Sequence, residues 1–337
     1  MTKRHTVISR RDVVAGGLSG VAAMAMPGPL RHGALASEAG KLRIGSLKFG
    51  SLGWLLKTVI DEGLDKAEGF ELVPVDMANT GAAKIGLLSG DADVIVSDWP
   101  WAMRQRSEGE TVRFAPYSSA LGAVMVAGDS PIKSLADLEG KQFGVAGTAL
   151  DKSWLLLRAY HQKQTGKDLA DVVSPIFAAA PLITEQVRQG RVDAALNFWT
   201  FSARLKGDGF RELVSLDDVL TGLGITPTPS LVGFIWSEKK TAGKEAEIAK
   251  FMSAIAKGNE LLATSDEAWG RLKETTRAKS DAEFEALKAY YRSGIPKGWN
   301  AEHTGAAEKL FNLLVQLGEK TLDDGKVKFD PALFYGS

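Results

Sequence analysis

The chain has 337 residues, and its 41 lysine and arginine side chains balance 41 aspartate and glutamate side chains. It contains no cysteine, which excludes disulfides, iron–sulfur clusters and cysteine nucleophiles. Beyond the first 36 residues only two histidines remain, His161 and His303, and they lie far apart in sequence. A zinc site and a histidine-based triad are therefore poorly supported. We expect no metal, no cofactor and no catalytic residue.

Residues 1–36 have the features of an export signal. Arg10 and Arg11 precede the apolar run 13–26, which is too short to span a bilayer, and Ala34 and Ala36 are small residues at the positions that a signal peptidase reads. The paired arginines favour the twin-arginine route, with an ordinary secretory signal or an uncleaved anchor as alternatives. Removing this segment takes away five basic and one acidic residue and leaves a net charge of −4. We expect a periplasmic protein that binds neither nucleic acid nor an anionic membrane.

The next hundred residues alternate between strand-like and helix-like segments. We expect strands at residues 42–46, 70–75 and 93–97, with helices opening near Trp54 and Asn79. Pro74 lacks a backbone N–H, so it places the second strand at a sheet edge. The third strand is apolar throughout, as in a buried parallel sheet.

A second cycle repeats the first with an offset of one hundred residues. The matched residues are Lys41, Trp54, Leu55, Leu56, Gly90, Asp93, Trp99 and Arg104 with Lys141, Trp154, Leu155, Leu156, Gly190, Asp193, Trp199 and Arg204. Tryptophan is uncommon, so two pairs in register outweigh any number of leucine matches. Strands are expected at 143–146, 172–177 and 193–197, with helices opening near Trp154 and Pro181. Strands alternating with helices predict two α/β lobes, each with a mostly parallel sheet.

Two segments are candidates for crossings between the lobes. Residues 114–127 hold two β-like pieces joined by Ser118 and Ser119, and the loop 216–230 precedes a β-like run at 231–237. Apolar residues at helical spacing then predict helices at 244–263, 281–293 and 302–320, which we expect to pack on the first lobe. The predicted division is 37–118 with 226–337 for the first lobe and 119–225 for the second.

Two motifs carry a family resemblance. Gly-Asp-Ala-Asp at 90–93 ends a helix and opens a strand, and the segment 129–141 (DSPIKSLADLEGK) runs into the strand at 143–146. Together they resemble the periplasmic solute-binding proteins of ABC importers, in the nitrate, sulfonate and taurine (NitT/TauT-like) group. The resemblance covers most of 41–240. It implies a type II periplasmic binding protein fold with a helical C-terminal extension. It also implies a monomer that closes its two lobes on a solute and delivers it to a membrane permease.

The predicted cleft departs from that group in its aromatic content. Tryptophans 54, 99, 101, 154 and 199 follow or open elements at the carboxyl ends of the predicted strands, where open α/β sheets bind ligands. This favours a small organic solute such as a sulfonate or carboxylate over a bare inorganic anion. Because Asp98 and Asp151 stand among the rings, an amine or zwitterion is the alternative.

The candidate ligand-binding residues each have a structural alternative. The full set is Lys48, Ser51, Trp54, Asn79, Thr80, Ser97, Asp98, Trp99, Ser118, Thr148, Asp151, Lys152, Ser153, Trp154, Asn197 and Trp199. The tryptophans are either cleft walls or lobe core. The loop residues before Trp154 either bind an anion at the helix N-terminus or simply cap that helix.

The same fold also serves other functions. The expected two-lobe fold also resembles that of a thiamine-pyrimidine synthase and of some menaquinone-pathway enzymes. The synthase class depends on a cysteine-rich motif and on active-site histidines, whereas this chain has no cysteine and only two histidines after the signal. An accessory or sensory solute-binding protein is a further alternative that sequence does not separate from transport.

Overall fold

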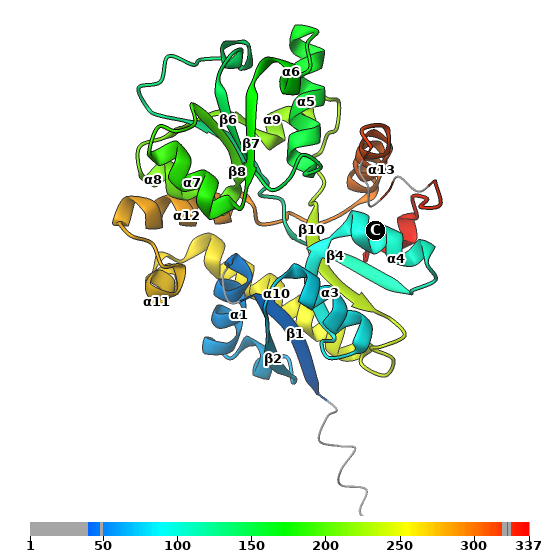
Figure 1. The fold of residues 1–337 in the computed structure, drawn as a ribbon. Coiled ribbons are helices and arrows are strands. Elements are labelled where there is room, and N and C mark those ends of the chain that lie inside the picture. Colours follow the sequence, from blue (N-terminus) through cyan, green and yellow to red (C-terminus); the bar gives the residue numbers. More distant parts are fainter. Residues whose placement is uncertain (1–39, 48–49, 319–321, 323–324, 337) are drawn as a thin grey trace, which may run out of the picture. The chain divides into compact units, whose positions relative to one another are not determined.

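The computed structural model describes residues 40–47, 50–318, 322 and 325–336 (Figure 1). The predicted export signal at 1–36 and Lys48 lie outside these residues. Among the described residues, no helix has the length and apolarity needed to cross a membrane.

The first sheet has five strands in the order β2-β1-β3-β10-β4. They are β1 (Lys41–Leu47), β2 (Glu71–Met77), β3 (Val94–Asp98), β4 (Val112–Ser118) and β10 (Val232–Ser237). Strand β10 runs antiparallel to both of its neighbours, and the other pairings are parallel. Strand β2, which contains Pro74, lies at the edge of the sheet, so that prediction is confirmed.

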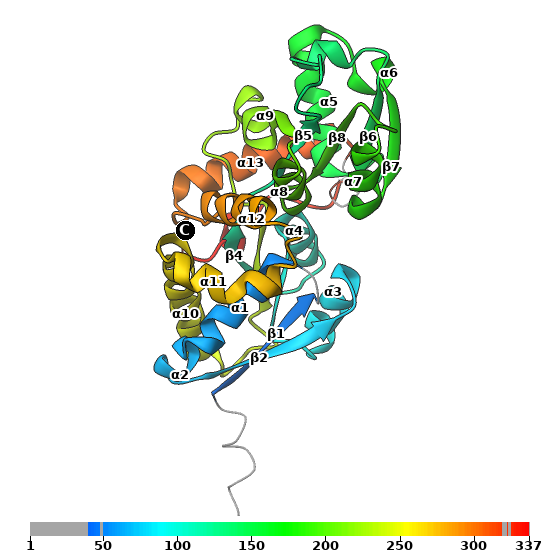
Figure 2. The same cartoon turned by 90° about the vertical axis from the view of Figure 1, so that its left-hand side faces the viewer.

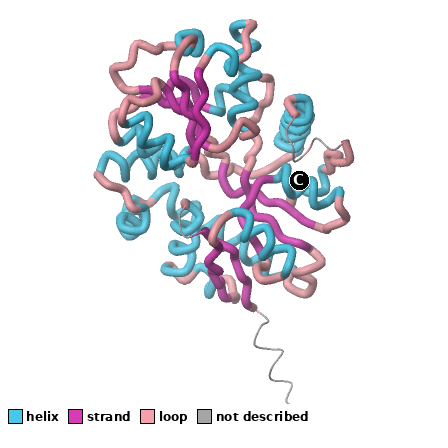
Figure 3. Tube along the Cα trace, viewed as in Figure 1, coloured by secondary structure: helices cyan, strands magenta, loops and turns pink. Residues whose placement is uncertain are grey.

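The second sheet repeats this order as β7-β6-β8-β5-β9. Its strands are β5 (Gly122–Val126), β6 (Gln142–Ala146), β7 (Ser174–Ala178), β8 (Ala194–Phe198) and β9 (Arg211–Ser215). Here β5 is the antiparallel strand. The two mixed sheets form separate groups of strands (Figure 3), and we call each sheet with its helices the first and the second lobe.

The repeated Gly-x-x-Asp motif has the same structural role in both lobes. Gly90 and Gly190 adopt left-handed backbone angles of +87° and +67° at the ends of their helices, which glycine tolerates best. Three residues later, Asp93 accepts the backbone N–H of Arg43 at 2.8 Å, and Asp193 accepts that of Gln142 at 2.8 Å. Each aspartate thereby ties the start of one central strand to its parallel neighbour.

Helices cover the faces of each sheet. The first lobe carries α1 (Ser51–Asp61), α2 (Leu64–Ala67), α3 (Thr80–Ser89), α4 (Trp99–Ser107), α10 (Glu245–Thr264) and α11 (Asp266–Thr276). The second lobe carries α5 (Lys152–Thr165), α6 (Leu169–Val172), α7 (Ala180–Arg188), α8 (Trp199–Gly207) and α9 (Leu216–Gly222), with a short 3-10 turn η1 (Leu135–Leu138). Helices α10 and α11 pack against α1 beside the first sheet (Figure 2). Pro181 lies in the first turn of α7, as predicted.

The C-terminal helices do not all return to the first lobe, contrary to our expectation. Helix α12 (Asp281–Ser293) packs along α8 of the second lobe, and α13 (Ala301–Gln316) contacts α5. The reason lies in tertiary contacts: Arg204 of α8 forms an ion pair with Glu283, which is fully buried on α12. Periodicity located these helices but carried no information about the partner surface.

The sequence analysis did not predict several other elements. Helices α2, α4, α6, α8 and α11 and strand β9 were not expected, and the predicted loop at 216–230 begins with the helix α9, which directly follows β9. A capping box marks the start of α9, because Ser215 accepts the backbone N–H of Asp218 at 3.0 Å and the Asp218 carboxylate reaches back to Ser215.

The C-terminal tail closes the core of the first lobe. It ends in a 3-10 turn, η2 (Pro331–Leu333), followed by Phe334, which is 1% exposed. The Phe334 ring stacks on Trp299 at 4.6 Å and meets Phe114 edge-on at 5.7 Å. The backbone N–H of Tyr335 donates to the carbonyl of Phe114 at 2.8 Å, so the tail is fastened to β4.

We therefore expect Phe334→Ala to lower the free energy of unfolding by about 3–5 kcal/mol, because it removes a buried ring at the centre of an aromatic cluster. Urea denaturation followed by circular dichroism measures this change. Leu182→Ala, at a leucine that is 51% exposed on α7, is the control and should change stability by less than about 0.5 kcal/mol. Equal losses from the two variants would contradict a structural role for the tail.

Candidate functional site

Four helices begin where central strands end, and they meet in pairs across the two lobes. In the first lobe α1 follows β1 and α4 follows β3; in the second lobe α5 follows β6 and α8 follows β8. Helix α1 meets α8 through Trp54 and Trp199, whose ring centroids are 6.0 Å apart. Helix α4 meets α5 through Asp98 and Lys152, whose carboxylate and ammonium groups are 3.5 Å apart.

This pairing follows the internal repeat. The repeat relates Trp54 to Trp154 and Trp99 to Trp199. It therefore matches α1 with α5 and α4 with α8. In one contact α1 meets α8, and in the other α5 meets α4. Each contact therefore joins the helix that follows β1 or β6 to the helix that follows β3 or β8 of the opposite lobe. The two contacts are therefore equivalent in position, although one is aromatic and the other ionic.

The aromatic contact extends into the C-terminal helices. Trp54 and Trp199 meet edge-to-face at an interplanar angle of 87°, and Tyr291 of α12 lies 6.2 Å and 6.4 Å from their rings. Trp269 of α11 packs against Trp54 at 6.0 Å. Burial around the Tyr291 hydroxyl raises its pKa well above the ordinary value, so it stays neutral as a donor to Asn259 at 2.9 Å. The lobes are thus joined here by apolar packing.

A cavity of about 190 Å³ opens beside this contact. Its lining comes from the start of α1, the first turns of α8 and the end of α11: Gly50, Gly53, Trp54, Thr200, Phe201, Arg204, Thr275, Thr276 and Arg277. Among the described residues, the lining includes two arginines and no acidic residue. Within the described residues, no side chain caps the first amides of α1 or α8, and neither helix has an acidic residue in its first turn. The helix dipoles therefore make this cavity attractive to an anion, whereas the charge of Arg204 is balanced by Glu283.

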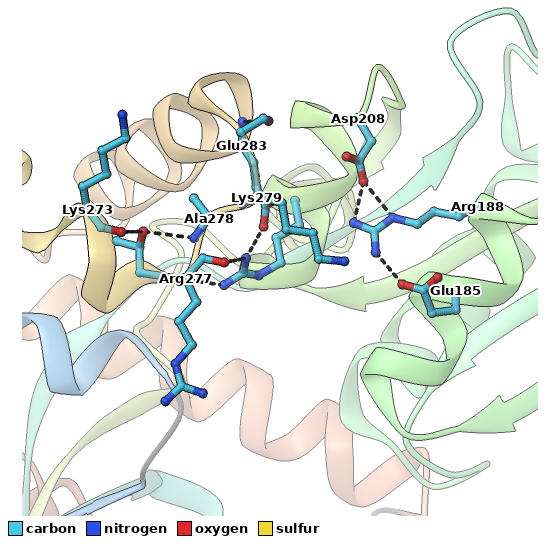
Figure 4. Close-up of polar contacts among 11 residues, drawn as sticks. Glu185, Arg188, Asp208, Lys273, Arg277, Ala278, Lys279 and Glu283 are labelled. Atoms are coloured by element: carbon cyan, nitrogen blue, oxygen red, sulfur yellow. Dashed lines mark hydrogen bonds and ion pairs between the residues drawn. The ribbon is translucent and has the colours of Figure 1, made fainter.

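Figure 4 shows the corner between α11 and α12, with Arg277, Lys279 and Glu283 labelled. Arg204 holds this corner against α8. The Arg204 guanidinium binds the Glu283 carboxylate and also donates to the carbonyls of Thr276 at 2.9 Å and Arg277 at 3.3 Å. Glu283 in turn accepts the backbone N–H of Lys279 at 2.8 Å. Breaking such a buried pair by removing one partner leaves an uncompensated charge, so this corner is a rigid part of the cavity wall.

Arg277 has the only positive φ angle among the described non-glycine residues, +55°. A left-handed conformation costs a residue with a β-carbon about 1–2 kcal/mol. The contacts that Arg204 makes with the carbonyls of Thr276 and Arg277 hold this backbone in place. Strained residues of this kind tend to gather at functional sites.

The ionic contact centres on the Asp98 carboxylate. Lys152 approaches it from the second lobe at 3.5 Å and Lys84 from the first lobe at 3.4 Å, and the Lys84 ammonium also lies 5.0 Å from the ring of Trp101. Burial opposes ionisation of Asp98, but the charges of Lys152 and Lys84 outweigh it and hold its pKa below the ordinary value. Asp98 also caps α4 by accepting the Trp101 N–H at 3.1 Å.

Capping is what the structure shows for the loop before α5. Asp151 accepts the backbone N–H groups of Ser153 at 2.9 Å and Trp154 at 3.3 Å. Burial raises the pKa of Asp151 above its ordinary value despite these bonds. The exposed Thr148 accepts the N–H of Leu150 at 3.2 Å. A carboxylate therefore already occupies the N-terminus of α5, as Asp98 does for α4.

Trp99 and Trp154 lie in the lobe cores rather than in a cleft wall. Trp99 is 0% exposed and packs edge-on against Phe334, and Trp154 is 1% exposed between Phe143 and Phe177. The aspartates that cap α4 and α5 are the residues at the lobe surface, and the following indoles turn inward. In this conformation both rings are buried inside the lobes, and their role as ligand contacts stays a prediction.

Other predicted residues are engaged in local contacts. The Asn197 amide donates to the Ala180 carbonyl at 3.2 Å and to the Thr184 hydroxyl at 2.9 Å inside the second lobe. Ser51 accepts the Tyr117 hydroxyl at 2.7 Å, and burial raises the pKa of that tyrosine. Asn79 caps α3 by accepting the Ala82 N–H at 2.9 Å.

The remaining candidates lie near the starts of α4 and α3 and at the first crossing between the lobes. Ser97 is buried at 3.5 Å from the Asp98 carboxylate, whereas Thr80 is exposed at the start of α3. Ser118 accepts the Ala120 N–H at 3.2 Å, and Ser119 donates its backbone N–H to the Gly294 carbonyl at 2.9 Å. The last two residues therefore hold the first crossing between lobes.

Three charged residues of the site were not among the candidates: Lys84, Arg204 and Arg277. Arg204 was visible as a member of the repeat, but Arg104, its match, instead pairs with Glu108 on the helix surface. No local signal singled out Lys84 or Arg277. Within the described part of the chain, no group of three or more histidine, aspartate or glutamate side chains is placed to hold a metal ion.

We expect Lys152→Met to loosen the lobes while Lys84→Met does not, because only Lys152 reaches Asp98 from the opposite lobe. The absence of native cysteines allows spin labels at Ile60→Cys and Leu182→Cys, both exposed and on different lobes, with the distance measured without solute. Partly exposed ion pairs contribute about 0.2–1 kcal/mol, so the shift in the open–closed equilibrium should be roughly 1.5- to 5-fold.

The pH dependence follows from the lowered pKa of Asp98. The ion pair between Asp98 and Lys152 stabilises the contact between the lobes fully above the ordinary aspartate pKa of about 4. This stabilisation is lost as the pH falls through the lower pKa that Asp98 has in the folded protein. A distance distribution that is identical in wild type and Lys152→Met would show that this pair does not hold the lobes.

Comparisons with known proteins agree with this architecture. The alkanesulfonate-binding protein SsuA of Xanthomonas axonopodis pv. citri, bound to MOPS, superposes with a TM-score of 0.65 at 18% identity, over 88% of this chain and 98% of that one. The aliphatic sulphonate-binding protein SsuA of Escherichia coli gives 0.64 at 19% identity, over 87% and 95%. The desulfurization enzyme DSZB gives 0.58 at 16% identity, over 87% and 94%.

These identities show a shared fold, and the predicted two-lobe fold of type II periplasmic binding proteins is confirmed. No curated protein sequence matched the chain. A family match covers residues 60–268, more than half of the chain, and carries the description NMT1/THI5 like. The chain therefore belongs to the NMT1/THI5-like family.

Proposed function

We propose that the chain is the periplasmic solute-binding component of an ABC importer, acting as a monomer that closes on a small organic solute and delivers it to a membrane permease. The observation that carries this proposal is the crossed meeting of four helix N-termini, α1 with α8 and α4 with α5, at the junction of the lobes. Solved sulfonate-binding proteins with the same fold support it. Export through the twin-arginine route remains a prediction.

The chemistry of the cavity favours an organic anion. Its lining combines an indole wall with two arginines, three threonines and uncapped helix amides. A solute with a short apolar body and a sulfonate or carboxylate would find both an apolar surface and hydrogen-bond donors there. The Xanthomonas protein is bound to MOPS, which is a sulfonate.

Two of the crossings between the lobes, those that connect the sheets, are suited to a hinge. The chain leaves the first sheet at Ser118, enters the second at Gly122 and returns between β9 and β10. A β-carbon at Gly122 would lie 2.2 Å from the carbonyl oxygen of Asn197, so only glycine fits where β5 meets β8. A solute would then shift the population from the open to the closed arrangement of the lobes, because it contacts both α1 and α8 only when these helices are together.

An enzyme is the alternative function, because the desulfurization enzyme DSZB has a similar fold. One DSZB structure is a cysteine-to-serine variant with biphenyl-2-sulfinic acid bound. The present chain contains no cysteine, so a cysteine-dependent reaction does not apply to it. His161 on α5 is bonded to the Lys167 carbonyl at 2.7 Å, and neither it nor His303 lines the cavity.

The proposal is tested by purifying the protein from its own periplasm and identifying retained solute by native mass spectrometry. A thermal-shift screen of organic sulfonates, carboxylates, amines and heterocycles follows, and the tightest binder is then incubated with protein and analysed for product. We expect an unchanged solute that binds with micromolar or tighter affinity. Conversion of the solute would establish an enzyme instead.

We expect Gly53→Leu to block solute binding without harming the fold. A β-carbon at Gly53 meets no atom within 4 Å, so the added side chain extends into the cavity that this residue lines. Replacing a helical glycine should raise the free energy of unfolding by up to about 1 kcal/mol. Gly270→Leu on α11 is the matched control, since its β-carbon also meets nothing and the residue is not in the lining. Undiminished binding by Gly53→Leu would place the solute elsewhere.

A further inference from the structure

Exposed apolar side chains gather at the carboxyl ends of the strands. Among the described residues, the large apolar side chains that are exposed are Leu47, Ile60, Ile85, Leu150, Phe177, Leu182, Phe198 and Tyr335. Leu47, Phe177 and Phe198 occupy one of the last two positions of β1, β7 and β8, and Leu150 and Leu182 closely follow the ends of β6 and β7. Single exposed apolar residues are normal on a protein surface, but most of these share the edge of the sheets where α/β proteins bind ligands.

Phe177 and Phe198 project from the same face of the second sheet. Strands β7 and β8 lie on either side of β6, and Val145 of β6 is paired with Phe177 on one side and with Leu196 on the other. Because side chains alternate along a strand, Phe198 shares the face of Leu196 and therefore that of Phe177. Helix α5 packs on this face, since Trp154 in its first turn lies 5.9 Å from the Phe177 ring.

The side chains at the outer limits of this face are exposed. Val145 and Leu196 are 0% and 2% exposed, whereas Phe177, on the edge strand, and Phe198, at the end of β8, are 36% and 42% exposed. Leu150, in the loop that leads from β6 into α5, is 40% exposed. These three side chains lie around the start of α5, and we call them the apolar rim: Leu150, Phe177 and Phe198.

The apolar rim is continuous with the contacts between the lobes. Phe198 directly precedes Trp199, which meets the first lobe at the aromatic contact. Leu150 closely precedes Lys152, which meets the first lobe at the ionic contact. The turn of α8 that follows Phe198 lines the cavity of about 190 Å³. The rim therefore extends along the second lobe from one contact to the other and begins beside that cavity.

We propose that the apolar rim binds the body of the solute, and that the receptor selects amphipathic organic anions with an aromatic ring or an alkyl chain of about six carbons or more. This inference rests on the proposed function and names its substrate class. The cavity is smaller than the pockets that enclose drug-sized ligands, so it accommodates a headgroup and a short stretch of the body. A longer body leaves the cavity, and it gains free energy by covering the exposed rings of the rim.

Affinity should therefore rise with the length of the solute. Each methylene group that is buried on the rim should strengthen binding about 2- to 4-fold. The probes are butane-, hexane- and octane-1-sulfonate together with pentanoate, heptanoate and nonanoate, which carry the same alkyl chains. Isothermal titration calorimetry at fixed ionic strength measures their affinities. The two series differ in headgroup but not in body, so the increase per methylene should be the same in both.

Substitutions in the rim should remove this dependence on length. Phe177→Thr and Phe198→Thr each delete an exposed ring and keep a residue suited to a strand, and Leu150→Gln tests the rim outside any strand. We expect the increase per methylene to fall below about 1.5-fold, while affinity for the butyl compounds changes less than about 2-fold. Ile60→Thr is the matched control, because Ile60 is 40% exposed at the far end of α1, and it should keep the wild-type increase.

The outcomes separate this inference from the proposed function. An increase per methylene that is the same in wild type and in all three rim variants overturns the role of the rim, and so does a wild type that binds neither series. A solute retained from the periplasm that has neither a ring nor an alkyl chain would overturn the rim and leave the receptor function standing. Product formed from a probe whose binding depends on the rim would support the rim and overturn the transport role.

An interface between two copies of the chain is the competing use of such a surface. Sedimentation of the wild type without solute should show a monomer. A dimer that Phe198→Thr abolishes would assign the rim to a second copy and overturn the inference.

Discussion

The structure depends on the crossed contact between helix N-termini of the two lobes. Trp54 meets Trp199, and Asp98 meets Lys152, so each lobe presents both of its strand-following helices to the other. The sheets, with their matching strand orders, place these helices at the carboxyl ends of the central strands. Because such ends are where open α/β sheets bind ligands, the junction is the candidate site.

The repeat produces two equivalent contacts, and their side chains make them different. Aspartates at the starts of α4 and α5 satisfy the free amides within the protein, and Lys152 and Lys84 balance Asp98. In the part of the chain that the structure describes, no carboxylate caps the start of α1 or α8, and arginines line the space beside them. One end is therefore suited to holding the lobes together, and the other is suited to receiving an anionic solute.

The C-terminal helices couple the site to both lobes. Helix α11 packs on α1 of the first lobe, and α12 packs along α8 of the second, so the corner between them spans the junction. A buried ion pair such as Arg204 with Glu283 adds little net stability compared with apolar packing, but it fixes one arrangement of its neighbours. Here it fixes the backbone of Thr276 and Arg277, and with it the wall of the cavity.

The sequence by itself determined the repeat, the two α/β lobes, most strands and the residues that meet at the junction, because tryptophan pairs, Gly-x-x-Asp motifs and helix starts are local signals. It also marked Trp54, Trp199, Asp98 and Lys152 as candidates. Only the tertiary structure decided that Trp99 and Trp154 turn into the cores, that α12 packs on the second lobe, and that Arg277 joins the cavity. Those outcomes depend on contacts between residues far apart in the chain, such as Trp99 with Phe334 and Arg204 with Glu283, which no periodicity or spacing records.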